Sequence, residues 1–254
     1  LEEQYDTPLF IREKKKLYLT DAGQILKDSL ETLRSDDHRM KIRMQQSMAG
    51  KKGLTFGVTM TIGEYAVIPS LARFLKAHPQ WEIHICYGNT QTLLSRLREG
   101  TLDFAIVEGY FREDLYTTRI LQKEPFIGVA SSKHIFQKPV SCLRDLTGER
   151  LLLREHGSGT RAILTKILAL NNLSAEDFSH IIEIENIHAI VSLLREDCGI
   201  SFLYQSAVKK ELEDKTLMEI PLSDFKIAHD FSFIWNKDSI FSAQYEAIFQ
   251  ELQK

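Results

Sequence analysis

The chain has 254 residues, of which 43% are hydrophobic, so it can bury one large core or two medium ones. Its formal net charge of −3 argues against general nucleic-acid binding by the bulk of the chain. Three cysteines, far apart and each in an apolar context, predict a reducing compartment without a disulfide framework, and no stretch is long and apolar enough to span a membrane.

Residues 1–20 contain a basic turn between two short β-like pieces. The turn carries Arg12, Lys14, Lys15 and Lys16. A basic cluster of this size is most often a solvated turn, but a basic β-wing beside a helix is also the way in which winged modules contact phosphates.

Residues 21–49 are predicted to form one long helix, because they include few β-branched residues and no proline. Their apolar residues recur at intervals of 4, 3, 7, 4 and 4 positions, which is close to a heptad seam. The seam consists of Leu26, Leu30, Leu33, Met40, Met44 and Met48. We expect it to dimerise with a second copy of the same helix; the alternative is a helix packed on its own domain. Glycines at 50 and 53 then predict a helix end and a linker.

After this linker the pattern changes to alternating strands and helices. Strands are predicted at 54–58, 81–85 and 103–107, and helices at 65–77 and around 93–97. Strands that alternate with helices of this length imply a parallel sheet.

The same order of elements recurs in the second half of the chain. Predicted strands at 151–153, 181–184 and 200–203 alternate with two helices. In each half a glycine ends the second helix just before the third strand, namely Gly100 and Gly199. Two similar βαβαβ halves imply two lobes.

We therefore expect an α/β fold with two lobes joined by two crossover strands, at 126–131 and 230–235. A final helix at 239–252 is expected to return to the first lobe. The first lobe would then comprise residues 54–130 and 232–254, and the second residues 131–231. Two strands that act as a hinge are the geometry of a protein that binds a ligand in a cleft.

Leu151 to Arg161, which reads LLLREHGSGTR, predicts an anion site. An apolar strand passes through a small-residue loop into a helix, and the free backbone N–H groups and positive dipole of a helix N-terminus attract anions. Arg154 and Arg161 bracket the loop. The alternative is a tight turn whose glycines only supply positive φ.

Polar residues at predicted strand ends indicate a binding site between the lobes, because ligands of open α/β sheets lie at the carboxyl ends of strands. Such a lining fits a small ligand with one or two oxyanion groups. Taken singly, each Thr or Asn there is more often a turn or cap residue. The candidate effector-binding residues are Thr59, Met60, Thr61, Asn89, Thr90, Glu108, Ser131, Arg154, Gly157, Ser158, Gly159, Thr160, Asn186 and Ser201.

Catalysis is poorly supported by the sequence. The eight histidines show no metal-ligand spacing, and neither GxSxG nor GxxxxGK[ST] occurs. Glu108 could act as a base, but a lone acid in a cleft is weak support for a reaction. We therefore predict a site that only binds, with no catalytic residue, no metal and no cofactor.

At this point the chain resembles a LysR-type transcriptional regulator that lacks most of its N-terminal helix-turn-helix. The opening residues look like that family's segment from the end of the recognition helix through the wing into the linker helix. The resemblance is carried by Pro8–Phe10, Arg12, LTDAG at 19–23, GLTFGVT at 53–59, LREGTLDFAIVEG at 97–109, REHGSGTR at 154–161 and LLREDCGISFLYQSAV at 193–208.

This resemblance implies a wing remnant at 1–20, a linker helix at 21–49 and two regulatory subdomains of the type-II periplasmic-binding-protein kind. It also implies a cytoplasmic homo-oligomer, commonly a tetramer, in which a small effector in the cleft shifts the DNA-bound assembly. The four basic wing residues would contact DNA phosphates, whereas base-specific readout would need the recognition helix. Carried over by position, the effector site would include Thr59, Thr61, Asn89, Thr90, Ser131, Thr160 and Asn186.

Two other interpretations use the same fold. A prephenate-dehydratase-like lyase would carry a Thr-Arg pair similar to Thr160 and Arg161, but the LysR-like opening and the linker helix have no place in it. A solute-binding protein for transport is disfavoured by the missing export signal and by the coiled-coil-like helix.

Overall fold

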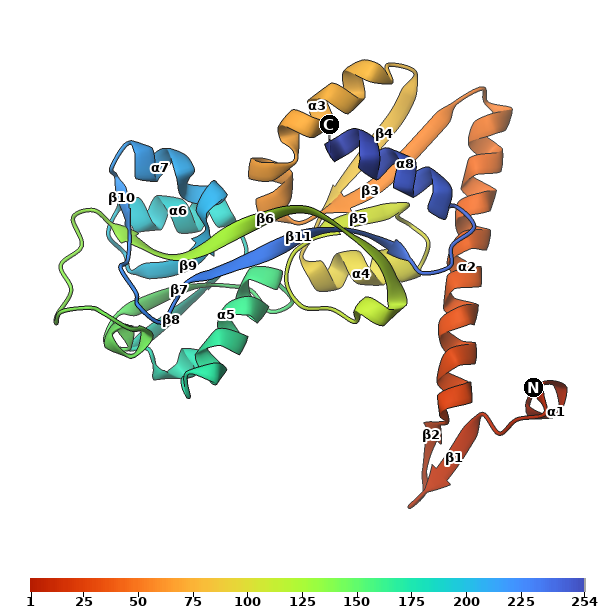
Figure 1. Cartoon of the computed structure of the whole chain (residues 1–254), viewed down its shortest axis with the longest axis horizontal. Helices are drawn as coiled ribbons and strands as arrows, with labels where there is room; N and C mark the ends of the chain where they lie inside the picture. Colours follow the sequence, from red (N-terminus) through yellow and green to blue (C-terminus); the bar gives the residue numbers. More distant parts are fainter. Residues whose placement is uncertain (254) are drawn as a thin grey trace.

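The structure is a computed structural model that describes residues 1–253, and it combines a long helix with a two-lobed α/β body (Figure 1). In the view of Figure 1, the long helix runs along the right edge. A small hairpin, which precedes the helix in the chain, lies at its lower end, well away from the body. The first elements are α1 (Glu2–Tyr5), β1 (Phe10–Glu13), β2 (Lys16–Leu19) and α2 (Asp21–Met48).

The predicted basic turn is the tip of the β1–β2 hairpin. Lys14 and Lys15 have φ angles of 43° and 70°, which a two-residue hairpin turn requires if it is to match the twist of its strands. Arg12, Lys14, Lys15 and Lys16 are all exposed, so the hairpin presents its charge to solvent.

Lobe I contains the first parallel sheet, in the strand order β4-β3-β5. The predicted helix at 65–77 is interrupted: a π-helical turn, η1, precedes α3, and Pro69 lies in the first turn of α3, where its missing N–H costs nothing. The elements of lobe I are β3 (Lys52–Val58), η1 (Ile62–Ala66), α3 (Ile68–Ala77), β4 (Trp81–Tyr87), α4 (Thr90–Arg98) and β5 (Phe104–Val107).

Lobe II repeats this arrangement, with parallel strands in the order β9-β7-β8. Its main elements are β7 (Arg150–Arg154), α5 (Gly159–Leu170), β8 (His180–Ile184), α6 (Ile187–Arg195), β9 (Ile200–Tyr204), α7 (Lys209–Glu213) and β10 (Leu217–Glu219). Short 3-10 turns lie at Glu113–Leu115, Leu143–Leu146, Ala175–Asp177 and Gln205–Val208. The internal repeat that the sequence predicts is therefore confirmed.

Two long strands, β6 (Tyr116–Ser131) and β11 (Ile227–Asn236), join the lobes. They pair antiparallel from Tyr116 with Asn236 to Phe126 with Ile227, so hydrogen bonding continues from one lobe into the other. The first crossing therefore lies at 116–125, earlier than the sequence predicts; residues 126–130 already pair with β9 inside lobe II. The prediction found only residues 126–131 of β6, because polar residues such as Arg119, Gln122 and Lys123 hide the alternation in its first part.

The largest core cluster is centred on stacked aromatic side chains of three neighbouring strands. Phe104 lies between Phe56 and Phe233, with ring centroids 4.8 Å and 4.2 Å apart. The last helix, α8 (Ser242–Gln253), packs Tyr245 and Phe249 onto this cluster and contacts α3, so it returns to lobe I as predicted.

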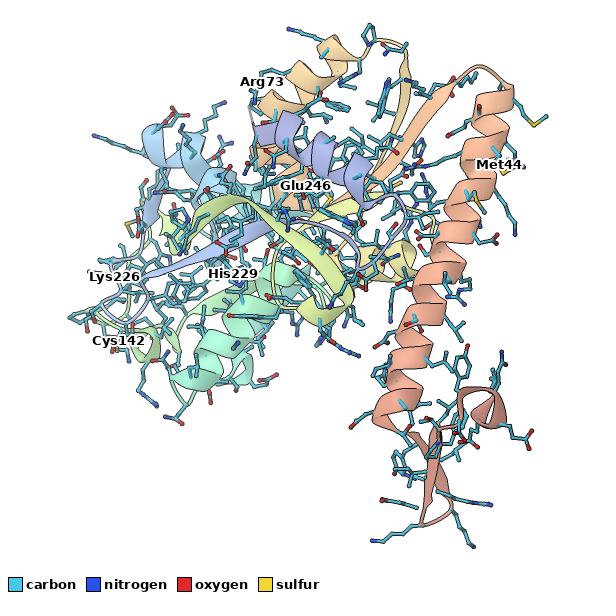
Figure 2. The ribbon with its side chains drawn as sticks, turned by 45° about the vertical axis from the view of Figure 1, so that its right-hand side comes forward. Met44, Arg73, Cys142, Lys226, His229 and Glu246 are labelled. Atoms are coloured by element: carbon cyan, nitrogen blue, oxygen red, sulfur yellow. The ribbon has the colours of Figure 1, made fainter. Side chains whose placement is uncertain are left out.

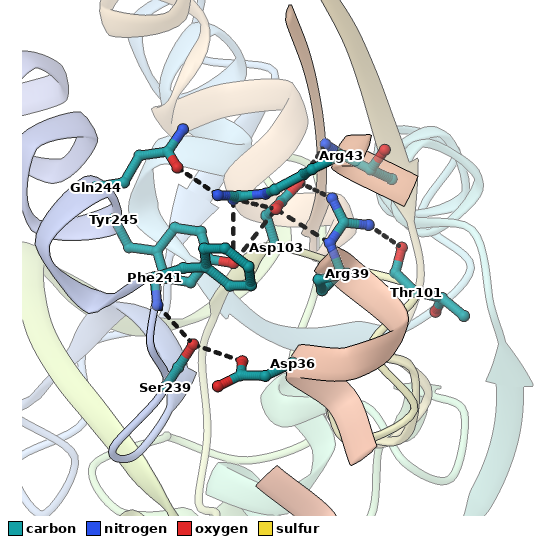
Figure 3. A network of polar contacts seen from close by, with 10 residues as sticks. Asp36, Arg39, Arg43, Thr101, Asp103, Ser239, Phe241, Gln244 and Tyr245 are labelled. Atoms are coloured by element: carbon teal, nitrogen blue, oxygen red, sulfur yellow. Dashed lines mark hydrogen bonds and ion pairs between the residues drawn. The ribbon is translucent and has the colours of Figure 1, made fainter. Parts of the chain in front are cut away.

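One face of α2 is docked on lobe I by polar contacts, which the sequence did not reveal. Asp103, just before β5, contacts both Arg39 and Arg43, and it also accepts hydrogen bonds from the Thr55 N–H (2.7 Å) and the Tyr245 hydroxyl (3.3 Å). Figure 3 shows these side chains converging on Asp103, with Arg43 over the ring of Phe241 at 3.8 Å.

The same docking extends along α2 toward its N-terminus. Asp36 accepts hydrogen bonds from the Ser239 hydroxyl at 2.7 Å and the Ile240 N–H at 2.9 Å. The Ser35 hydroxyl accepts a hydrogen bond from Asn236 at 2.8 Å. These contacts use a buried face of α2 and tie its second half to lobe I.

The predicted apolar seam lies on other, exposed positions of α2. Leu30, Leu33, Met40 and Met44 are between 42% and 62% exposed, while Leu26 is half-buried. Figure 2 shows Met44 on the side of α2 that is turned away from the lobes. The helix thus has both a polar face packed on its own domain and an apolar face without a partner among residues 1–253.

Candidate functional site

The start of α5 brings lobe II into contact with lobe I. Gly157 has a φ of 88°, as a tight turn requires, but Gly159 has another role. A Cβ at Gly159 would lie 2.2 Å from the carbonyl oxygen of Glu108, so only glycine permits the two lobes to approach this closely. The first turn of α5 leaves the N–H groups of residues 159–161 without acceptors inside the helix.

Three predicted threonines converge on Glu108, which follows β5. The Thr59 hydroxyl donates to its carboxylate, the Thr160 hydroxyl lies 3.4 Å from the other carboxylate oxygen, and the Thr90 hydroxyl donates to its carbonyl at 2.9 Å. Thr59 and Thr90 belong to lobe I, and Thr160 belongs to lobe II. The predicted meeting of the two lobes at these side chains is therefore present.

The Glu108 carboxyl, predicted as part of the site lining, lies between the threonine hydroxyls of the two lobes. Only 2% of this residue is exposed. Burial raises the pKa of Glu108 above its ordinary value of 4.5, although hydrogen bonds from Thr59, the charge of Arg154 and the Thr160 hydroxyl act in the opposite direction. The two lobes thus meet at a buried acid whose pKa lies above its ordinary value.

This raised pKa predicts the pH dependence of stability. The folded chain holds the Glu108 proton more tightly than the unfolded chain does, so the stabilising contribution present at low pH is lost as pH rises from 4.5 through the raised pKa. Glu108→Gln cannot ionise and should show a flatter dependence of melting temperature on pH. Scanning fluorimetry from about pH 5 to pH 8 measures this slope. The exposed Glu219→Gln serves as control, and an equal slope in both variants would refute the assignment.

An open cavity of about 560 Å³ adjoins this buried centre. Among the predicted residues, Met60, Asn89, Arg154 and Asn186 line it. Asn89 and Asn186 are also the N-caps of α4 and α6, accepting hydrogen bonds from the N–H groups of Thr92 (2.9 Å) and Ala189 (3.0 Å). Asn89 and Asn186 therefore cap helices and also line the cavity.

Arg154 is the only arginine in the cavity lining, and it is 4% exposed. Its Nε and Nη2 donate to the Glu155 carboxylate at 2.8 Å and 3.1 Å. Its Nη1 has no hydrogen-bond partner within residues 1–253, and the same holds for the buried hydroxyls of Thr61 and Ser158. Buried donors without partners are rare, and a ligand group could satisfy them.

Four predicted residues line a second cavity of about 560 Å³, namely Thr90, Gly157, Ser158 and Gly159. Two others line neither cavity. Ser131 ends β6 and Ser201 lies near the start of β9, where its hydroxyl donates to the Leu152 carbonyl at 2.7 Å. The carboxyl end of β9, which faces lobe I, is Tyr204 instead. The prediction placed Ser131 and Ser201 in the cleft because it took them for cleft-facing strand ends, and we correct it here.

The prediction also missed part of the cavity wall. Tyr87, Glu155, Glu183 and Glu185 line the cavity beside the predicted residues. The position of Glu183 and Glu185 at the end of the strand 181–184 was the available signal. Carboxylates do not fit a site for an anion, and the predicted site therefore did not include these two glutamates.

A contact near this cavity also joins the lobes. The His188 ring, on α6, lies 2.8 Å from the Glu64 carboxylate and 2.9 Å from the Tyr65 hydroxyl, both in η1. Burial, and then the charges of Glu64 and Glu211, raise the pKa of Tyr65 to about 12, so this hydroxyl stays protonated near neutral pH.

Within the described part of the chain, no group of three His, Cys, Asp or Glu side chains is arranged to hold a metal ion. Cys86, Cys142 and Cys198 are free thiols. No helix among residues 1–253 is long and apolar enough to cross a membrane.

The family model described as the LysR substrate binding domain matches residues 50–254. A probable RuBisCO transcriptional regulator of Thalassiosira pseudonana is 27% identical over 259 residues, covering 99% of this chain and 84% of that protein. The CcmR regulatory domain of Synechocystis PCC6803 in complex with 2-PG has a TM-score of 0.70 and 19% identity, covering 80% of this chain and 96% of that domain. The effector-binding domain of QuiR in complex with shikimate has a TM-score of 0.67 and 20% identity, with the same coverage.

Proposed function

Because the chain belongs to the LysR family and is the effector-binding domain of a LysR-type transcriptional regulator, we propose that its inter-lobe cleft senses a small metabolite carrying an oxyanion group. The observation that carries this proposal is the convergence of Thr59 and Thr160, from different lobes, on Glu108 beside an open cavity. A ligand at this place contacts both lobes, so its binding energy depends on their relative arrangement.

The donors near the cavity support an oxyanion as the recognised group. They comprise the Nη1 of Arg154, which has no hydrogen-bond partner within residues 1–253. A second cavity, which shares His156 with the first, adds the unpartnered hydroxyl of Ser158 and the first turn of α5. Each charge-assisted hydrogen bond contributes about 1.5–3 kcal/mol net, so two or three suffice for micromolar to millimolar affinity. The similar CcmR and QuiR domains were solved with 2-PG and shikimate, which supports a small metabolite.

The same proposal assigns roles to the rest of the chain. Residues 1–20 are the wing, whose Arg12 and Lys14 to Lys16 contact DNA phosphates, and residues 21–49 dimerise through the apolar seam of α2. Residues 54–130 with 232–254, and residues 131–231, form the regulatory subdomains of a cytoplasmic homo-oligomer, except that residues 126–130 pair with β9 and so belong with the second subdomain. Effector binding then shifts the population of lobe arrangements, and α2 passes this bias to the DNA-binding part.

The lyase alternative is not favoured. Arg161 donates to the Arg154 carbonyl at 3.0 Å and contacts Glu183, so its guanidinium already holds the loop rather than standing free for a substrate. The matched relatives are transcriptional regulators.

A thermal-shift screen of small metabolic anions tests the proposed function. Specific ligands raise the melting temperature by mass action. Thr160→Val should abolish the largest shift, because it removes the lobe II hydroxyl that contacts Glu108 and thereby alters the arrangement of the two lobes on which ligand binding depends. Thr117→Val, at the far end of β6, should retain the shift. An undiminished response in Thr160→Val would contradict the proposed site.

A further inference from the structure

The wall of the inter-lobe cavity is acidic. It contains Glu155, Glu183 and Glu185 but only one arginine, Arg154. The charge of Arg154 is matched by Glu155, and Glu183 contacts Arg161. Glu185 is exposed and has no ion pair within residues 1–253. The cavity therefore offers one carboxylate without a countercharge.

Glu108, which is buried behind the cavity, adds to this surplus of acidic groups. Glu108 already accepts from the threonine hydroxyls that would otherwise bind a ligand anion there. A ligand oxyanion thus finds donors near Arg154 and the first turn of α5, whereas a second negative group would meet carboxylates. Low-dielectric walls strengthen this like-charge repulsion.

We propose that the effector is a zwitterion, whose carboxylate lies against Arg154 and whose cationic nitrogen lies against Glu185. This inference rests on the proposed function and names the ligand class of the same site. Both charged groups are within reach of one small molecule, because Arg154 and Glu185 line the same cavity of about 560 Å³. They come from the ends of neighbouring strands, since Arg154 of β7 pairs with Ile184 of β8, the residue before Glu185.

Glu183 offers a second hydrogen-bond acceptor to the cationic nitrogen of the ligand. Because Arg161 already balances the negative charge of Glu183, this residue contributes mainly a hydrogen bond. An ammonium group has three donors, and the two glutamates with the Asn186 side chain offer oxygen acceptors at this wall. A simple monocarboxylate leaves these acceptors to water, and a dianion is repelled by them.

Matched ligand pairs test the inference. The protein amino acids and their 2-hydroxy acid counterparts share a carbon skeleton and a carboxylate but differ in the cationic nitrogen. We expect at least one amino acid to raise the melting temperature, and calorimetry should give about tenfold weaker binding for its hydroxy counterpart. Glu185→Gln should remove most of this difference while it leaves the hydroxy acid affinity unchanged.

Two further variants complete the design. Arg154→Met should weaken both members of the pair, since it removes the carboxylate partner. Glu219→Gln alters an exposed carboxylate of β10, which lines neither of these cavities, and should change neither affinity.

The possible failures are distinguishable. Equal affinity for amino and hydroxy acid, or shifts only from acids without a cationic nitrogen, would overturn the zwitterion but retain an oxyanion effector. Shifts from amino acids that survive in both Arg154→Met and Thr160→Val would overturn the cleft itself as the site.

Discussion

Replacing Asp103 with alanine is expected to lower the free energy of unfolding by about 3–5 kcal/mol. The side chain of Asp103 has no exposed surface, and Arg39 is only 2% exposed. Removal of the shared carboxylate leaves the Arg39 guanidinium buried without its countercharge. It also strips partners from Arg43, the Thr55 N–H and the Tyr245 hydroxyl (Figure 3).

Urea denaturation followed by circular dichroism measures this loss from the shift of the unfolding midpoint. The control is Asp37→Ala on the same helix, where the pair with Lys41 is 51% and 67% exposed. An exposed pair contributes little, so this variant should stay within about 0.5 kcal/mol of the parent. Losses of similar size in the two variants would show that burial around Asp103 does not stabilise the docked helix.

The second large effect concerns the exposed face of α2. If α2 dimerises as proposed, the double change Leu33→Lys and Met44→Lys should convert the proposed homo-oligomer into monomers. Burial of such side chains contributes about 1.5–3 kcal/mol each, and in a symmetric pair of helices both copies lose it. The dissociation constant should therefore rise at least about a hundredfold, since each 1.4 kcal/mol is a factor of ten.

Light scattering after size-exclusion chromatography reads out the mass directly. Both residues are about 60% exposed, so the folded monomer should survive the changes and keep its circular dichroism spectrum. Leu170→Lys, on an exposed position of α5, provides the same chemical change away from the seam. A double variant that retains the parent mass would remove α2 from the interface.

The individual helices and strands were predictable because the spacing of apolar residues repeats within each of them. Alternation in Leu54 to Val58 marks β3, and the apolar residues Ile190, Val191 and Leu194 mark one face of α6. The convergence of Thr59, Thr90 and Thr160 was also predictable, since strand order alone sends the carboxyl ends of both parallel sheets to one cleft. By the same rule, the start of β9 was the wrong end for Ser201.

Docking of α2 was not predictable, because nothing in the sequence relates Arg39 to Asp103, 64 positions away. In isolation, Arg39 and Asp36 look like the solvated positions of an amphipathic helix. Their burial depends on where the end of β11 and the start of β5 meet α2, and that is a property of the packed lobes.

The sequence by itself determined the two-lobed α/β fold, the long helix with its apolar seam and the glycine-rich start of α5, because each follows from spacing within one element. Only the tertiary structure decided which charges in the cleft are already matched. Glu108 accepts a hydrogen bond from Thr59 and Glu155 pairs with Arg154, whereas Glu185 lies exposed at the cavity. Electrostatic pairing depends on distance in space and on burial, and neither can be read from the order of residues along the chain.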